Sequence, residues 1–171
     1  MTKPNETPAG ETQTVLFFDG FCGLCSASVD FMLIRDHKRR LLYSPLQGET
    51  ARSLVQAGFL SEGDVQDLDS VIAVVYQKKP GPLSMSFTKP DAKPVEKLTR
   101  SRAILHCLAQ LEDDRGFLAK RYRLVAFLGK LIPVFLSDLV YGLIAKNRFR
   151  LLGKRETCRI PTPEERDRFL L

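Results

Sequence analysis

The sequence lacks several features that would place the protein in a special class. None of its apolar runs approaches the ~20 residues that a membrane-spanning helix needs. Internal repeats and low-complexity tracts are absent as well, which excludes a solenoid built from sequence repeats. Residues 1–13 contain no apolar segment of the kind found in signal peptides, so we expect a disordered tail and a cytoplasmic protein.

Cysteine is also scarce, at four residues in a chain of 171. A chain of this length needs no disulfides to fold, because it buries roughly two-thirds of its unfolded surface. In the reducing cytosol, two cysteines close together in sequence are more often catalytic or metal-binding than structural. The cysteines are therefore the first candidates for functional residues.

Positive charge is concentrated in the last third of the chain. Residues 114–171 hold 13 Lys and Arg against 6 Asp and Glu, whereas residues 1–113 hold 13 against 14. Such a block can contact nucleic acid, an acidic partner or anionic lipid. The simpler interpretation is a set of solvated helix faces, so no nucleic-acid partner is expected and membrane contact is the less favoured alternative.

Short apolar runs alternate with amphipathic segments along the chain. The apolar runs predict four strands, at residues 14–19, 41–43, 71–76 and 95–98. Apolar residues spaced three and four apart predict helices at residues 22–36, 49–57, 117–131 and 137–152. Ser101 is the expected N-cap of a further helix, and Thr162 to Glu165 read as a capping box that opens a short terminal one. The proline-rich residues 78–93 are expected to form a loop.

This order, β-α-β-α-β-β-α followed by further helices, predicts an α/β protein. Strands separated by helices are expected to pair in parallel through right-handed crossovers, and the closing ββ step to add an antiparallel edge. The arrangement corresponds to a thioredoxin-like mixed sheet with helices on both faces plus an added C-terminal helical segment. We expect the dithiol domain to span residues 14–113, and a basic helical extension, residues 114–171, to pack on the same domain.

A Cys-Gly-Leu-Cys sequence, Cys22 to Cys25, lies between the first strand and the first helix. Two thiols at this spacing can close into a disulfide ring and reopen, and free N–H groups at a helix start favour the thiolate. Cys22 is the expected nucleophile towards a disulfide or a peroxide. Cys25 is expected to be less exposed and to resolve the mixed disulfide. The prediction is a thiol-disulfide oxidoreductase that uses no cofactor and is re-reduced by an unknown reductant.

Asp19 precedes Cys22 by three residues, at the end of the first apolar run. A buried carboxylate beside a dithiol can accept the proton of the resolving thiol. Alternatively, Asp19 and Gly20 form a turn in which the carboxylate accepts hydrogen bonds from nearby backbone N–H groups. Both roles remain open at this stage.

Two non-catalytic alternatives apply to the cysteine pair. The thiols can pack as small hydrophobic side chains, or they can provide two ligands of a zinc site. No second Cys-x-x-Cys pair exists, so further ligands would have to come from single residues. The candidates are His37, His106, Cys107 and Cys158. Either alternative describes a binding module whose basic helices dock on a partner. No metal is expected in the preferred interpretation.

The segment Phe18 to Cys25, with its Asp-x-x-Cys-x-x-Cys spacing, resembles the DCC family of thiol-disulfide oxidoreductases. Further segments look like the same family: Tyr43 to Gln47, Ser101 to Ala103, Ile132-Pro133, Tyr141, Asn147-Arg148, Gly153 and Cys158. The resemblance covers about residues 14–171. It implies a thioredoxin-like fold, with Asp19, Cys22 and Cys25 as the active site.

One feature of thioredoxins and glutaredoxins is missing from this sequence. Those proteins place a cis-proline immediately before the third strand, facing the dithiol. Here the residues before Val71 are Asp69 and Ser70. A cis bond without proline costs about 2.5–4 kcal/mol, so a trans bond is expected.

The remaining candidates lie in the C-terminal half. Cys107 fits the apolar side of its helix and is expected in the core, whereas His106 should be exposed. Cys158 is either a buried anchor, which we favour, or a third redox thiol whose pKa is lowered by Arg155 and Arg159.

The role of the added helices is less defined. Arg148 and Arg150 either line the site or face water. The apolar face of residues 117–131 is expected to cover the sheet, with a dimer interface or an anionic membrane as alternatives.

Overall fold

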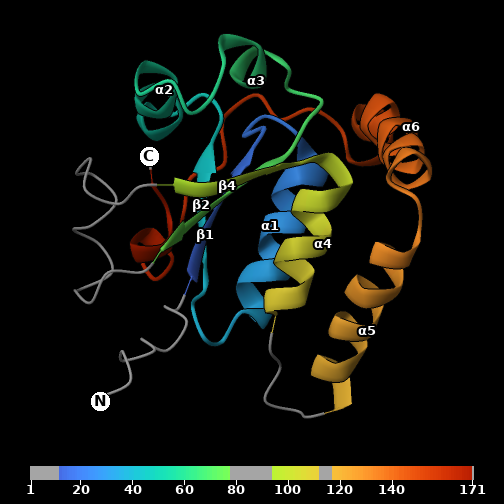
Figure 1. Ribbon diagram of the computed structural model, residues 1–171. Coiled ribbons are helices and arrows are strands. Elements are labelled where there is room, and N and C mark those ends of the chain that lie inside the picture. The colour runs from blue at the N-terminus through green and yellow to red at the C-terminus, as the bar shows by residue number, and fades with distance from the viewer. Residues whose placement is uncertain (1–11, 78–93, 112–116, 171) are drawn as a thin grey trace, which may run out of the picture.

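Four strands form one mixed sheet in the order β2-β1-β3-β4 (Figure 1). The computed structural model describes residues 12–77, 94–111 and 117–170, so most of the predicted tail and the predicted loop 78–93 lie outside it. The strands, each close to its predicted position, are β1 (Thr12–Phe18), β2 (Leu41–Pro45), β3 (Ile72–Gln77) and β4 (Pro94–Thr99). The α/β mixed sheet expected from the sequence is confirmed.

The direction of one strand differs from the prediction. β1 and β2, which flank the first helix, pair in parallel, and β3 and β4 pair antiparallel, as expected. β3 also follows helices but pairs antiparallel to β1, so the rule that strands separated by helices run parallel was wrong here. The connection from β2 to β3 begins and ends at the same end of the sheet, because Pro45 pairs with Phe18 and Ile72 pairs with Phe17. β3 therefore runs in the direction opposite to β1 and β2.

Successive side chains of β1 point to opposite faces of the sheet and enter two different cores. Leu16 and Phe18 pack under α1 (Gly23–Arg35) and α4 (Arg100–Gln110). Val15 and Phe17 pack under α2 (Glu49–Gln56) and the short α3 (Glu62–Gln66), a helix that was not predicted. Helices therefore cover both faces, and the carboxyl end of β1 leads into α1 in the middle of the sheet.

Two predicted caps are placed differently. α4 begins at Arg100 with Thr99 as its N-cap, so Ser101 lies inside the helix, where its hydroxyl contacts the Ser137 hydroxyl at 3.1 Å. The Thr162 N–H does donate to Glu165 Oε2 at 3.0 Å, but only the one-turn 3-10 helix η1 (Arg166–Arg168) follows.

α5 (Phe117–Leu131) and α6 (Val134–Leu152) form an outer layer at one side of the molecule (Figure 1). α5 packs on α4, and α6 packs on α1 and α4. The expectation that residues 117–131 cover the sheet was therefore wrong, because these helices cover other helices. Their large apolar side chains remain exposed and are called the outer apolar face: Leu124, Val125, Phe127, Leu128, Leu131, Ile132, Val134, Phe135, Leu136, Leu139, Val140, Leu143 and Ile144. Within the described residues, no helix is both long and apolar enough to cross a bilayer.

The last residues of the described chain return to the free edge of β2. The Leu170 N–H donates to the Tyr43 carbonyl at 2.8 Å, and Phe169 forms a parallel bridge with Tyr43. Arg168 pairs with the buried Asp36, whose Oδ2 also accepts from the Leu41 N–H at 2.8 Å. The segment after α6 is thereby held along its length against α1 and β2.

Candidate active site

The two cysteines of the motif lie on one turn at the start of α1. Cys22 is the N-cap of the helix, with an extended backbone, and its Sγ accepts a hydrogen bond from the Cys25 N–H at 3.2 Å. Both are free thiols. A cap position places the Cys22 sulfur at the positive end of the helix dipole, beside the N–H group of its partner.

The exposure of the two thiols is the reverse of the expected order. Cys22 is 0% exposed, whereas Cys25 is only partly buried. The spacing of apolar residues places Cys25 on the inner side of α1. This spacing does not show which other segment packs on the N-terminal end of the helix. Another segment covers that end.

Residues 153–159, here called the covering segment, lie directly on the dithiol turn. The Gly23 N–H donates to the Gly153 carbonyl at 3.2 Å, and Cys22 forms an isolated antiparallel bridge with Lys154. The Arg155 N–H donates to the Phe21 carbonyl at 2.8 Å. Gly153 has a φ of 73°, a left-handed conformation that glycine adopts freely and that turns the chain from α6 towards the dithiol.

The end of α6 lies so close to the dithiol turn that glycine is also required at position 23 of that turn. A Cβ on Gly23 would lie 2.2 Å from the Leu152 carbonyl oxygen. The motif glycine therefore allows backbone to pack on backbone at this point.

Asp19 is buried at the end of β1 and has three partners. Its Oδ1 accepts from the Phe21 N–H at 3.0 Å and from Gln47 Nε2 at 3.0 Å, and its Oδ2 lies 3.6 Å from Arg148 Nη2. The bond to Phe21 is the predicted turn contact. The contact with Arg148 shows that the carboxylate also has a buried counter-ion.

Arg148 is 5% exposed and reaches the site from α6. It pairs with Asp69 as well as with Asp19. Burial alone would lower the pKa of Arg148, but the hydrogen bond to Asp69 and the charges of Asp69, Asp19 and Cys22 outweigh burial and raise it. The choice left open between Arg148 and Arg150 is thus settled, because Arg150 is exposed.

The Cys25 thiol lies in surroundings that favour its neutral form. Burial raises the pKa of Cys25 most, and the hydrogen bond to Cys22 and the negative charges of Cys22 and Asp19 raise it further, against a smaller lowering effect of Arg148. The Cys25 thiol therefore keeps its proton at neutral pH.

The peptide bond between Ser70 and Val71, directly before β3, is trans as expected. The Val71 N–H donates to the Tyr141 hydroxyl at 2.9 Å. Together with the pairing of Asp69 with Arg148, this bond ties the start of β3 to α6. The backbone N–H of Val71 is consequently already occupied.

Cys158 contacts the dithiol loop through its sulfur. A Cβ on Gly20 would lie 2.2 Å from Cys158 Sγ, so only glycine fits beside it. The less favoured alternative for Cys158, a redox thiol with a lowered pKa, is not supported, because burial and the charge of Asp19 raise the pKa of Cys158. The Arg159 side chain pairs with Asp30 and Glu165. The Arg159 N–H donates to the Gly20 carbonyl at 3.1 Å and holds the segment in place.

The other two candidates lie away from this loop. Cys107 is fully buried in the core between α1 and α4, as predicted. His106 is partly buried and lies 3.0 Å from the Thr14 hydroxyl, so the expectation of an exposed side chain was wrong. Within the described residues, no group of three or more His, Cys, Asp and Glu side chains could hold a metal ion.

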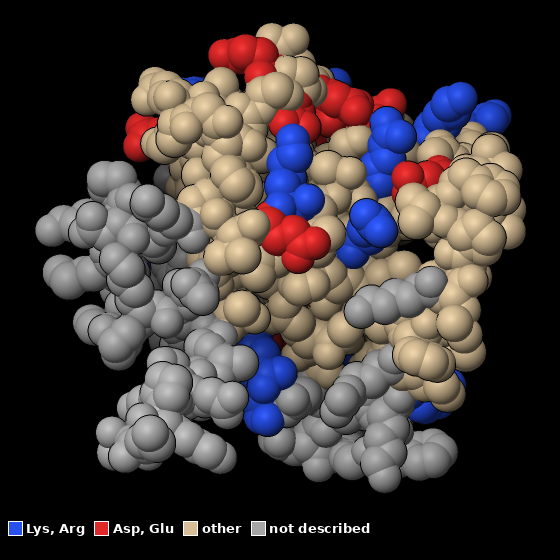
Figure 2. All heavy atoms as spheres, in the orientation of Figure 1, with Lys and Arg blue, Asp and Glu red and all other residues tan. Residues whose placement is uncertain are grey.

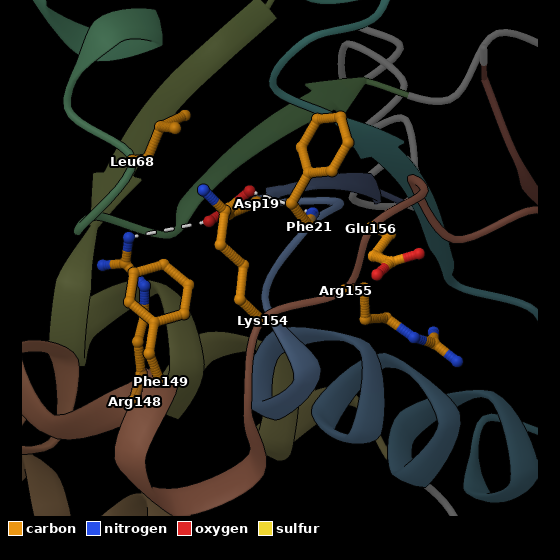
Figure 3. Close-up of a pocket in the computed structure, with 8 residues that line it drawn as sticks. All are labelled: Asp19, Phe21, Leu68, Arg148, Phe149, Lys154, Arg155 and Glu156. Atoms are coloured by element: carbon orange, nitrogen blue, oxygen red, sulfur yellow. Dashed lines mark hydrogen bonds and ion pairs between the residues drawn. The ribbon is translucent and has the colours of Figure 1, made fainter.

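A pocket of about 750 Å³ opens beside the turn. Figure 3 shows Asp19 and Arg148 pointing towards each other in it, from the end of β1 and from α6. The complete lining is Asp19, Phe21, Leu68, Arg148, Phe149, Lys154, Arg155 and Glu156. Its charged residues are of both signs, with Arg148, Lys154 and Arg155 beside Asp19 and Glu156.

The fold and the site together define an α/β protein with a mixed, thioredoxin-like sheet and a cysteine pair at the start of its first helix. The chain belongs to the DCC1-like thiol-disulfide oxidoreductase family, whose model matches residues 16–154. The resemblance noted from the motif is thereby confirmed.

Two curated relatives align with most of the chain. The uncharacterized protein YuxK of Bacillus subtilis (strain 168) is 29% identical over 157 residues, covering 91% of this chain and 93% of its own. The DCC family protein At1g52590, chloroplastic, of Arabidopsis thaliana is 23% identical over 150 residues, covering 88% of this chain and 71% of its own. No solved structure matches the chain significantly.

Several contributors to the site were not singled out from the sequence. Gln47, which bonds to Asp19 and to the Gly20 N–H, was noted only as part of a family-like segment. Lys154 was not noted, although it follows a glycine that ends a helix, a usual point at which a chain changes direction.

Proposed function

We propose that the protein catalyses thiol-disulfide exchange through Cys22 and Cys25. The observation that carries the proposal is the N-cap position of Cys22, whose sulfur accepts the Cys25 N–H at 3.2 Å. Membership of the DCC1-like thiol-disulfide oxidoreductase family supports a redox role of this kind.

In the proposed reaction, the Cys22 thiolate attacks one sulfur of a substrate disulfide, and the other substrate sulfur leaves as a thiolate. Cys25 then loses its proton and attacks Cys22 Sγ, which forms the Cys22–Cys25 disulfide and releases the second substrate thiolate. The substrate gains two electrons and the dithiol loses two, so an external dithiol or two monothiols must reduce the enzyme again.

The raised pKa of Cys25 supports this order of events, because a neutral thiol waits for a base before it attacks. Asp19 is the candidate for that base, since its charge acts on Cys25. In this scheme, Arg148 is a positioning residue that holds the Asp19 carboxylate beside the dithiol turn.

The burial of Cys22 adds one requirement. For a substrate sulfur to reach Cys22, the covering segment must leave the turn and break its backbone bonds to Gly20, Phe21 and Gly23. Opening of this segment is therefore part of the proposed catalytic cycle.

The test uses 5,5′-dithiobis(2-nitrobenzoate), an anionic aromatic disulfide, with dithiothreitol as reductant. Cys22→Ser is expected to lose the turnover that exceeds the rate without enzyme. Cys25→Ser, treated with the disulfide in the absence of dithiothreitol, is expected to accumulate a mixed disulfide on Cys22 that mass spectrometry detects. Cys107→Ala, which removes a buried thiol outside the motif, is the matched control and should keep its activity. Turnover that survives in Cys22→Ser, or a mixed disulfide found on Cys25 in that variant, would overturn the assigned order.

The same preparations separate this proposal from the non-catalytic alternative. Stoichiometric zinc in the purified protein that is lost in Cys22→Ser would favour a metal-binding module.

A further inference from the structure

α6 is attached to the rest of the protein through polar side chains. The residues that face the protein are polar: the Tyr141 hydroxyl accepts from the Val71 N–H, Arg148 pairs with Asp19 and Asp69, and Ser137 contacts Ser101. They are four and seven residues apart, so they occupy one side of the helix.

The opposite side of α6 is apolar and exposed. Phe135, Leu139 and Leu143 follow one another at four-residue steps and are 76%, 58% and 58% exposed. Phe127 and Leu131 of α5 add side chains that are 60% and 67% exposed. Figure 2 shows the surface over α6 largely in the colour of uncharged residues, with blue Lys and Arg spheres and some red Asp or Glu spheres beside it. Contiguous exposed apolar surface of this kind marks an interaction site.

The charged residues of α5 and α6 are mostly cationic. Lys146 and Arg150 continue the line of Leu139 and Leu143 towards the C-terminal end of α6, and both are exposed. Across residues 117–152 there are seven Lys and Arg and one acidic residue. That residue, Asp138, bonds to Ser101 on the inner side of the helix.

We propose that the outer apolar face docks on an anionic lipid surface. The apolar side chains enter the boundary between headgroups and acyl chains, while Lys146 and Arg150 meet lipid phosphates, as in other interfacial helices with a cationic border. Docking of this kind needs no membrane-spanning helix. A second copy of the chain fits less well, because a two-fold contact through this face would bring two cationic borders together.

The test measures co-sedimentation of the full chain with phosphatidylcholine vesicles, with and without phosphatidylglycerol. Binding is expected with the anionic vesicles and should weaken as salt is added. Leu139→Ser on α6 and Val95→Ser on the edge strand β4 remove side chains of similar exposure, 58% and 62%. Leu139→Ser is expected to weaken vesicle binding about tenfold, and Val95→Ser to leave it unchanged.

A second variant keeps the test independent of folding. Replacing Lys146 and Arg150 by Gln should weaken binding to anionic vesicles about fivefold per charge without touching an apolar residue. Three results would overturn the proposal: no binding to anionic vesicles, equal loss in Val95→Ser and Leu139→Ser, or a stable dimer of the free protein that Leu139→Ser dissociates. The last would assign the face to a second copy.

Discussion

The sheet and the outer layer use apolar side chains in opposite ways. In β1, Val15 to Phe18 are all at most 2% exposed, because helices cover both sides of the strand. In α6, the large apolar residues point outward, and the helix is attached through Tyr141 and Arg148. Stability thus comes mainly from the sheet and its four helices, whereas α6 is placed so that a buried cation reaches the dithiol site.

The largest expected difference comes from one substitution made in each region. Leu16→Ala in β1 removes a buried side chain and should lower the free energy of unfolding by about 4 kcal/mol. Leu139→Ala, at a residue that is 58% exposed, should change it by less than about 0.5 kcal/mol. Urea unfolding followed by circular dichroism measures both, and equal losses would contradict the division between the two regions.

The next effect concerns the link between the two regions. Arg148→Met leaves Asp19 buried without its cation and should cost about 3 kcal/mol, since breaking a buried ion pair strands the remaining charge. Arg150→Met, on the same helix but exposed, is the control and should cost less than about 0.5 kcal/mol. If both variants unfold at the wild-type urea concentration, the contact between Arg148 and Asp19 does not hold α6 in place.

The smallest effects come from two Gly→Ala substitutions that should change the free energy of unfolding in opposite directions. Gly23→Ala forces the Leu152 carbonyl away from the dithiol turn and should destabilise by about 2 kcal/mol. Gly142 in α6 has open space at its Cβ position, so Gly142→Ala should stabilise by about 0.5–1 kcal/mol. Gly23→Ala should also speed alkylation of Cys22 by iodoacetamide, because the covering segment is displaced. An unchanged rate would show that this segment does not limit access.

The inner region could be predicted from the sequence because its patterns are local. The run Val15 to Phe18 is apolar on both faces, which is typical of a central strand, and β1 is central. The motif Asp19, Cys22 and Cys25 was also placed correctly at the junction of β1 and α1. The roles of these three residues stay a prediction.

The outer region could not be predicted in the same way. Spacing showed that the C-terminal helices have apolar residues but not that those of α6 point outward, because a period identifies a face and not its partner. The burial of Cys22 depends on Gly153 and Lys154, about 130 residues further along the chain, and no local pattern reports such a contact. The antiparallel direction of β3 and the true start of α4 likewise depend on packing in three dimensions.

The bridge between Phe169 and Tyr43 has a consequence for self-association. β2 lies at an edge of the sheet, where unpaired N–H and C=O groups can recruit a strand from another molecule. The Leu170 N–H already occupies the Tyr43 carbonyl, and the residues beside it lie along that edge. At the other edge, β4 carries the exposed charges of Glu96 and Lys97. Both margins of the sheet are therefore protected against cross-β aggregation, one by the chain's own last turn and the other by charge.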